Sequence, residues 1–266
     1  MGSAGDARRL VEAASGRPGS ELWSALRDPA PVRARLHLAG MIERRRAGEP
    51  LQYVTGSWSF RHLDLMVDRR VHIPRPETEV VVEAALEELG RMGSPRRVVD
   101  LGTGSGAIAL ALASEGPAVE VWATDTSAAA LDVASANLAG LGGRAAARVR
   151  LAQGSWYDAL PADLAGAVDL LVSNPPYVAD SDEVEAVVSR WEPAEALWSG
   201  PTGLEATSEI LAGAGRWLAP TGVVVLEIAH DRAAETVAVA ERHGLCAIVR
   251  PDLAGRQRVL VARPRP

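Results

Sequence analysis

The sequence contains no lysine, because all 28 of its basic Lys and Arg residues are arginine. A lysine nucleophile or general base is therefore excluded. Cysteine is almost as scarce, and the single Cys246 excludes an internal disulfide and a metal site built on two thiolates. Low cysteine use is typical of the cytosol, so we expect a cytoplasmic protein. Cys246 lies in an apolar run and is expected to be a small buried residue.

Long apolar runs are also missing, since no stretch approaches the roughly 18 residues of a membrane-spanning helix. The first ten residues lack the basic and then apolar stretch of a signal peptide, so we expect no membrane association. A net charge of −6 counts against a protein that holds long nucleic acid through its phosphates. The hydrophobic content of 47% in 266 residues favours a soluble protein with one substantial core and a small second one.

Residues 1–47 are predicted to form a small helical domain. Apolar residues recur there at roughly helical spacing, and prolines separate the helical stretches. The apolar residues are Leu10, Val11, Leu22, Leu26, Leu36, Leu38, Met41 and Ile42, and the prolines are Pro18, Pro29 and Pro31.

Residues 48–72 are predicted to form a β-hairpin that links this domain to the next. Their β-type runs alternate in hydrophobicity and are broken by a glycine turn at Gly56. Two prolines in residues 73–77 then fix an extended loop before a helix at about 77–90. The β-type residues are Gln52, Tyr53, Val54, Thr55, Trp58, Phe60, Leu63, Leu65 and Val67.

Residues 73–266 are predicted to form an α/β domain, because strands and helices alternate from residue 96 onward. Such alternation predicts a doubly wound, mostly parallel sheet with helices on both faces. The last two strand-like runs are separated only by a loop and predict an antiparallel pair at one edge. The expected strands are 98–101, 119–124, 149–152, 168–173, 223–228, 245–249 and 259–262, and the expected helices are 106–114, 128–138, 204–218 and 232–243.

A glycine-rich loop follows the first of these strands, in V-V-D-L-G-T-G-S-G at 98–106. Glycine adopts φ > 0 readily and lets a ligand approach the backbone closely. The G-x-G-x-G spacing is an incomplete and, alone, weak match to the dinucleotide-binding pattern. The next strand-like run ends at Asp125, and a carboxylate there can accept hydrogen bonds from both ribose hydroxyls of an adenosine. The loop and Asp125 together predict an adenosine site.

A second chemical segment is V-D-L-L-V-S-N-P-P-Y-V at 168–178. Its apolar strand stops at Asn174, so Asn174–Tyr177 is expected on the same rim of the sheet as the glycine loop. Two successive prolines stiffen the backbone and present their carbonyl groups in a fixed direction. The Asn174 oxygen and a proline carbonyl can accept both hydrogens of an –NH2 group, while the Tyr177 ring covers a planar amide or base.

These motifs resemble a class I S-adenosylmethionine-dependent methyltransferase, and N-P-P-Y resembles the signature of those that methylate a planar –NH2 nitrogen. With G-E-P-L-Q-Y-V-T-G at 48–56 and I-P-R-P-E-T-E at 73–79, the chain closely resembles the HemK/PrmC family from about Gly48 to its end. That family consists of protein-(glutamine-N5) methyltransferases that act on peptide chain release factors. The resemblance implies the class I α/β fold, S-adenosylmethionine as cofactor, a release factor as partner, and no metal.

The resemblance also implies individual roles. Asp125 would hold the ribose, Trp156 would flank the adenine, and Asn174 would lie beside the donor as well as the substrate. The residues expected to wrap the methionine moiety are Gly102, Thr103, Gly104, Ser105 and Gly106. The residues expected to bind the glutamine of a Gly-Gly-Gln loop are Asn174, Pro175, Pro176 and Tyr177, of which Asn174, Pro175 and Tyr177 are the catalytic candidates.

Four other residues have less specific interpretations. Arg75 either helps to close the donor pocket, positions the substrate or is solvated. Glu227 either faces the crevice at the end of a strand or caps the next helix. His230 is expected at a helix start, and Glu192 lies in a segment that, by the resemblance, borders the substrate.

Competing functions remain open at this point. The –NH2 group could belong to adenine in DNA or RNA or to a glutamine of a ribosomal protein, although the low positive charge counts against nucleic acid. A nucleotide-binding oxidoreductase or a non-catalytic binding domain would use the glycine loop but leave Asn174–Tyr177 without a role. We expect the protein to be a monomer.

Overall fold

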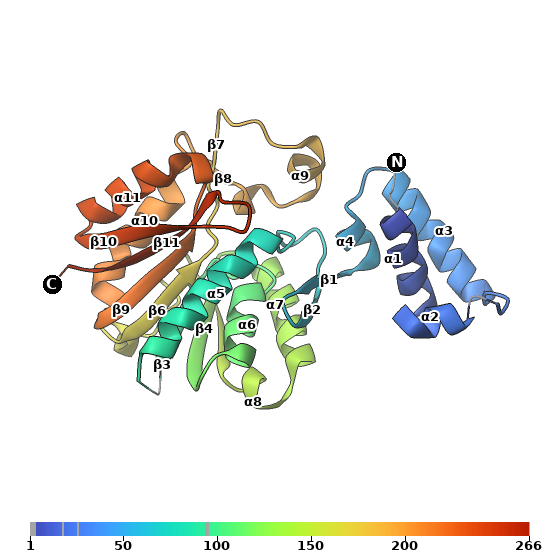
Figure 1. Cartoon of the computed structure of the whole chain (residues 1–266), viewed down its shortest axis with the longest axis horizontal. Helices are drawn as coiled ribbons and strands as arrows, with labels where there is room; N and C mark the ends of the chain where they lie inside the picture. The colour runs from blue at the N-terminus through green and yellow to red at the C-terminus, as the bar shows by residue number, and fades with distance from the viewer. Residues whose placement is uncertain (1–3, 18, 26, 94–95, 266) are drawn as a thin grey trace.

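The computed structural model describes residues 4–17, 19–25, 27–93 and 96–265. Figure 1 shows a helical lobe at the N-terminal end beside a larger α/β body. The core of the lobe is built from apolar residues of its first, third and fourth helices: Leu10, Met41, Leu51 and Val54. The prediction of helices here is confirmed, whereas Pro18 and Leu26 lie outside the described residues. The helices are α1 (Ala4–Ser15), α2 (Gly19–Ala25), α3 (Val32–Arg46) and α4 (Leu51–Thr55).

The expectation of β-structure at Gln52–Thr55 is wrong, because these residues belong to α4. Pro50 precedes the helix with φ of −52°, and Gly56 ends it in the left-handed conformation with φ of 75°. Leu51 and Val54, three positions apart, both pack into the core of the lobe. That tertiary contact selects a helix over the strand that the alternation favoured.

The predicted hairpin is present directly after this helix. It consists of β1 (Ser57–Phe60) and β2 (Leu63–Met66), which pair antiparallel. The strands turn at residues 61–62, where Arg61 has φ of 52°, rather than at Gly56. Asn137 fixes the hairpin to the α/β body, because its side chain accepts a hydrogen bond from Met66 N and donates one to Met66 O.

The main sheet has seven strands in the order β10-β11-β9-β6-β3-β4-β5. Strands β5, β4, β3, β6 and β9 run parallel, and β11 pairs antiparallel with both β9 and the edge strand β10. The predicted mostly parallel sheet with an antiparallel pair at one edge is thus confirmed. The strands are β3 (Arg96–Leu101), β4 (Val119–Asp125), β5 (Val149–Gln153), β6 (Val168–Ser173), β9 (Leu218–Glu227), β10 (Leu245–Pro251) and β11 (Gln257–Pro264).

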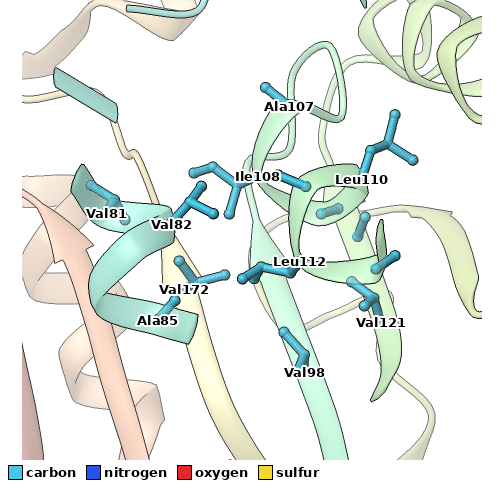
Figure 2. Close-up of a cluster of buried hydrophobic side chains, with 14 of the residues drawn as sticks. Val81, Val82, Ala85, Val98, Ala107, Ile108, Leu110, Leu112, Val121 and Val172 are labelled. Atoms are coloured by element: carbon cyan, nitrogen blue, oxygen red, sulfur yellow. The ribbon is translucent and has the colours of Figure 1, made fainter. Parts of the chain in front are cut away.

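Alternate residues of the central strands enter different cores, which makes the body a three-layer α/β/α structure. Val98 packs with α5 and α6 on one face, as Figure 2 shows, whereas its neighbour Val99 belongs to the core beneath α10 and α11. Leu170 and Leu171 of β6 divide in the same way. Since both faces are covered, these strands are apolar throughout. The covering helices are α5 (Pro76–Arg91), α6 (Ala107–Glu115), α7 (Ala128–Leu141), α10 (Glu205–Trp217) and α11 (Ala233–Arg242).

The remaining elements are short and mostly border the carboxyl ends of the strands. Strands β7 and β8 pair parallel in a small separate sheet that follows the N-P-P-Y segment. The prediction that Cys246 is buried is wrong: it is exposed, because edge strand β10 buries alternate residues and Leu245 takes the inward position. The short elements are α8 (Gly143–Ala146), η1 (Ala162–Leu164), β7 (Val178–Ala179), α9 (Ala186–Trp191), η2 (Ala194–Ala196), β8 (Trp198–Gly200) and η3 (His230–Arg232).

The strand order reverses its direction of progress between β3 and β6. From β3 the chain adds β4 and β5 on one side, and β6 and β9 on the other. Ligands of open α/β sheets bind in the crevice outside the strand ends at such a point. The glycine loop follows β3 and the N-P-P-Y segment follows β6, so both predicted segments lie there. Within the described residues, no helix is long and apolar enough to cross a membrane.

Candidate functional site

The glycine loop adopts a conformation that requires glycine. Gly102, Gly104 and Gly106 have φ of 71°, 56° and 84°, values that favour a residue without Cβ. Gly102 N donates to Thr124 O at 2.8 Å, and Gly104 N donates to Asp125 Oδ2 at 2.8 Å. A Cβ added to Gly104 would have no heavy atom within 4 Å. The backbone of Gly104 therefore faces open space that a ligand can fill.

Gly106 differs from the other two glycines because it does not line the cavity. It is the N-cap residue of α6. A Cβ there would lie 3.2 Å from Leu110 Cδ1 and 3.5 Å from Ala134 Cβ. Gly106 therefore serves the turn into α6 and the packing of that helix, directly after the cavity-lining residues 102–105.

Asp100 lies beneath the loop and ties the strand to the helix. Its Oδ2 accepts hydrogen bonds from Thr103 Oγ1 at 2.7 Å and from Ala109 N at 3.1 Å. Complete burial raises the pKa of Asp100 to about 7, against the lowering effect of these two hydrogen bonds. The side chain thus sets the geometry of the loop from inside the protein.

Asp125 is the last residue of β4 and lines the cavity. Its Oδ2 is the acceptor for Gly104 N, and its Oδ1 accepts a hydrogen bond from Ser127 N at 2.9 Å. A carboxylate oxygen has two lone pairs, so Asp125 retains capacity for two hydroxyl donors. Burial raises the pKa of Asp125, although its backbone hydrogen bonds favour the charged form.

Trp156 forms the wall beside the glycine loop. Its backbone has φ of 43°, and its carbonyl oxygen accepts a hydrogen bond from Thr124 Oγ1 at 3.0 Å. The indole Nε1 donates to Glu209 Oε2 at 2.6 Å. Ring atom Cζ3 lies 3.6 Å from the position of a Cβ on Gly102. Held at both ends, the indole is a fixed apolar surface of the cavity.

The N-P-P-Y segment is joined to the glycine loop through the ends of their strands. Ser173 Oγ donates to Leu101 O at 2.5 Å. Asn174 Nδ2 donates to Thr78 Oγ1 at 3.2 Å, and Tyr177 Oη donates to Glu227 Oε1 at 3.2 Å. Burial, and then the negative charge of Glu227, raise the pKa of the Tyr177 phenol. Tyr177 is therefore neutral at physiological pH.

One cavity of about 280 Å³ joins the two segments. Its size is near the lower end of the range for small-molecule sites, about 300 to 1,000 Å³. The glycine loop and the N-P-P-Y segment thus share one space, as the sequence predicted. The predicted site residues that line it are Gly102, Thr103, Gly104, Ser105, Asp125, Trp156, Asn174, Pro175, Pro176 and Tyr177.

The structure also places the less specific candidates. Arg75 forms an ion pair with Glu192 and does not line the cavity. Buried Glu192 also accepts a hydrogen bond from Ile73 N at 3.1 Å and lies 2.6 Å from His72 Nδ1. The Glu192 cluster therefore fastens the segment after N-P-P-Y to the loop before α5. His230 begins the short helix η3, as expected.

Two residues that sequence reasoning missed support the site. Thr78, in the first turn of α5, is buried and lines the cavity. Asn137, in α7, donates to Ser105 O at 2.9 Å and so connects the glycine loop to the hairpin. Each is a polar residue in a largely apolar helix face, which is the signal that could have found them.

Comparisons with known proteins identify the family. A model of the PrmC N-terminal domain matches residues 3–56, and a model of the methyltransferase small domain matches residues 78–195. A release factor glutamine methyltransferase from Xylella fastidiosa strain 9a5c is 44% identical over 237 residues, which cover 88% of this chain and 84% of that protein. A release factor glutamine methyltransferase from Bordetella pertussis is 43% identical over 258 residues, or 96% of this chain and 92% of that protein.

The chain belongs to the release factor glutamine methyltransferase family. As a member, it is an S-adenosylmethionine-dependent methyltransferase, and the predicted resemblance to HemK/PrmC is confirmed. A solved structure of a ribosomal protein L11 methylase from Lactobacillus delbrueckii subsp. bulgaricus has a TM-score of 0.55 at 19% identity. It covers 79% of this chain and 99% of that one, and it shows the shared class I fold.

Proposed function

We propose that this release factor glutamine methyltransferase transfers a methyl group from S-adenosylmethionine to N5 of the glutamine in the Gly-Gly-Gln loop of a peptide chain release factor. The observation that carries the proposal is the shared cavity, in which the open backbone of Gly104 and the acceptor groups of Asn174 and Pro175 line one space. A methyl donor held by the first and a carboxamide held by the second would meet there.

The residues of the glycine-loop side fit the donor. The loop leaves space in front of Gly104 for the methionine moiety, and Asp125 retains acceptor capacity for two ribose hydroxyls. Trp156 offers an apolar ring that adenine can pack against. S-adenosylmethionine, when bound, supplies a methyl group already activated by its sulfonium sulfur, so these residues only need to bind and orient it.

The residues of the N-P-P-Y side fit an amide nucleophile. An amide nitrogen is a weak nucleophile because its lone pair is delocalised into the carbonyl group. In our proposal, Asn174 Oδ1 and the Pro175 carbonyl oxygen each accept one N–H of the substrate amide, which leaves electron density on nitrogen and aims it at the methyl group. Tyr177 covers the planar amide. As the N–CH3 bond forms, the S–CH3 bond breaks and S-adenosylhomocysteine leaves. The nitrogen becomes acidic as it gains the methyl group and releases one proton to water, so no strong base is needed before the transfer.

The substrate can be tested directly. The purified protein is incubated with a release factor and labelled S-adenosylmethionine, and the Gly-Gly-Gln peptide is examined by mass spectrometry. We expect a mass increase of one methyl group on the glutamine. A ribosomal protein preparation and an adenine-containing DNA duplex serve as competing substrates, and preferential labelling of either would contradict the proposal.

The organisation of the chain fits this reaction. We propose that residues 1–47 form a substrate-docking domain, residues 48–72 a hairpin linker and residues 73–266 the catalytic domain. We propose that the protein acts as a monomer. The net charge of −6 supports a protein substrate over nucleic acid, and the single cysteine supports a cytoplasmic location. No metal is needed for the proposed reaction.

A further inference from the structure

A chain of hydrogen bonds leads from the half-buried Asn174 into the protein, where the bond between Thr78 and Glu227 is buried. Asn174 Nδ2 donates to Thr78 Oγ1 at 3.2 Å, and Thr78 Oγ1 donates to Glu227 Oε2 at 2.6 Å. The other oxygen of Glu227, Oε1, accepts the Tyr177 hydroxyl at 3.2 Å. Thr78 is 3% exposed and Glu227 is 1% exposed. Helix α5, strand β9 and the segment after β6 thus meet around the Glu227 carboxylate, and its partners Thr78 and Tyr177 line the cavity.

The direction of these hydrogen bonds is set at Glu227. Both oxygens of Glu227 accept hydrogen bonds, Oε2 from Thr78 and Oε1 from Tyr177, and a hydroxyl has a single proton to donate. Thr78 gives its proton to Glu227, so toward Asn174 its oxygen can only accept. That requirement turns the –NH2 end of the Asn174 carboxamide toward Thr78. No described residue donates to Asn174 Oδ1, which leaves this oxygen available to a ligand in the cavity.

We propose that Glu227 and Thr78 are positioning residues for the methyl transfer, which hold the Asn174 carboxamide with its nitrogen inward and its oxygen available to the substrate –NH2 group. The proposal resolves the two interpretations of Glu227, since its carboxylate bonds to Thr78 and Tyr177 rather than capping the next helix. With the amide reversed, Asn174 would present donors to a substrate group that itself only donates.

The cost of burying this carboxylate supports a role beyond packing. A fully buried carboxylate is unfavourable unless hydrogen bonds or nearby charges compensate. Here burial raises the pKa of Glu227, and the Thr78 hydrogen bond and then the positive charge of buried Arg258 oppose that shift. Arg258 also pairs with Asp252 at 3.6 Å. A carboxyl group kept in this buried position, hydrogen-bonded to two cavity residues, is typical of a functional site.

The first test separates positioning from folding and from donor binding. Glu227→Gln keeps the shape of the side chain but adds a donor, and Thr78→Val removes the hydroxyl. We expect either variant to lower kcat by about 10- to 100-fold, with the dissociation constant for S-adenosylhomocysteine within about twofold of wild type. Thr78→Ser keeps the hydroxyl and should recover most of the rate lost in Thr78→Val. Glu241→Gln, at an exposed position in α11, is the matched control.

A double variant tests whether the two residues act through one path. If both act only on Asn174, Glu227→Gln combined with Thr78→Val should cost little more than the more severe single change. Multiplication of the two single effects would overturn the proposal. So would wild-type turnover in a folded single variant, or loss of donor binding equal to the loss of turnover. Should Glu227→Gln fail to fold, the Thr78→Val and Thr78→Ser pair decides by the same criteria.

The second test does not depend on the substrate. The chain has only two asparagines, Asn137 and Asn174, so selective ¹⁵N-asparagine labelling yields two side-chain –NH2 signals that can be assigned with Asn174→Ala. We expect Thr78→Val and Glu227→Gln to move the Asn174 signal and leave Asn137 as an unchanged reference. An unmoved Asn174 signal in the folded variants would refute the proposal. Because the proposal rests on the proposed function only in its kinetic test, absence of release factor methylation by wild type would instead refute that function.

Discussion

Replacement of Asn174 by alanine gives the sharpest test of how the cavity works. The change removes the carboxamide whose Nδ2 is bonded to Thr78 Oγ1 and whose Oδ1 is available to the substrate. Gly104 and Asp125, which we propose bind the donor, keep their own hydrogen bond at 2.8 Å. The substitution therefore removes the acceptor that we propose for the substrate amide and leaves the glycine-loop side of the cavity in place.

The size of the effect follows from the number of hydrogen bonds lost. Loss of one preorganised hydrogen-bonding group at a reacting centre costs about 3 to 4 kcal/mol, which corresponds to about a 100- to 1,000-fold decrease in kcat. The folded state loses one neutral hydrogen bond, worth about 1 kcal/mol. The protein should therefore remain folded, with a thermal midpoint lower by only a few degrees.

The assay measures the two halves of the cavity separately. Turnover is followed by mass spectrometry of the Gly-Gly-Gln peptide, and donor affinity by calorimetric titration with S-adenosylhomocysteine. Gln257→Ala removes an exposed carboxamide from β11 and should leave both quantities unchanged. Equal losses of turnover and donor affinity in Asn174→Ala would refute the proposal that Asn174 binds the substrate amide and not the donor.

Three further changes test other parts of the site. Gly104→Ala should weaken S-adenosylhomocysteine binding in calorimetry by at least about tenfold, because φ of 56° is strained for alanine and the new methyl group enters the ligand space; unchanged affinity would exclude close approach of the donor. Gly203→Ala should lower kcat by more than its loss of thermal stability accounts for, because φ is 75° and the new Cβ would lie 2.7 Å from Tyr177 O. A normal kcat would show that Tyr177 tolerates displacement. Glu192→Gln should lower the free energy of unfolding at pH 7 by about 2 kcal/mol, as measured in urea. Burial raises the pKa of Glu192, but the hydrogen bond and charge of His72 and the charge of Arg75 outweigh burial and hold the pKa below its usual value. The difference in unfolding free energy between wild type and Glu192→Gln should therefore be complete above about pH 5 and disappear as the pH falls below the lowered pKa. A difference that does not depend on pH would contradict the role of the charge.

The sheet and the shared cavity could be predicted because their signals are local. Apolar runs such as Val168–Ser173 are buried on both faces, so nearly every residue carries the strand signal. Gly102 and Gly104 are required by local backbone angles, and parallel strands place their carboxyl ends on one rim. The shared rim predicts that Tyr177 and Gly104 lie in one space, and both line the cavity.

Predictions failed where a distant contact outweighs a local pattern. Residues 51–55 alternate like a strand, but packing of Leu51 and Val54 into the N-terminal lobe makes them helical. Cys246 lies in an apolar run, but its place on the edge strand β10 leaves it exposed. Gly106 shares the left-handed φ of the other loop glycines but does not line the cavity, so its role in donor binding stays a prediction.

The sequence by itself determined the strands of the main sheet, the glycine loop and the N-P-P-Y segment, because backbone angles and hydrophobic patterns act over a few residues. Only the tertiary structure decided which polar groups meet. Thr78 and Glu227 are 149 positions apart, yet their side chains form a buried hydrogen bond of 2.6 Å. No pattern within either segment specifies that contact, since it exists only when α5 and β9 pack against the same end of β6.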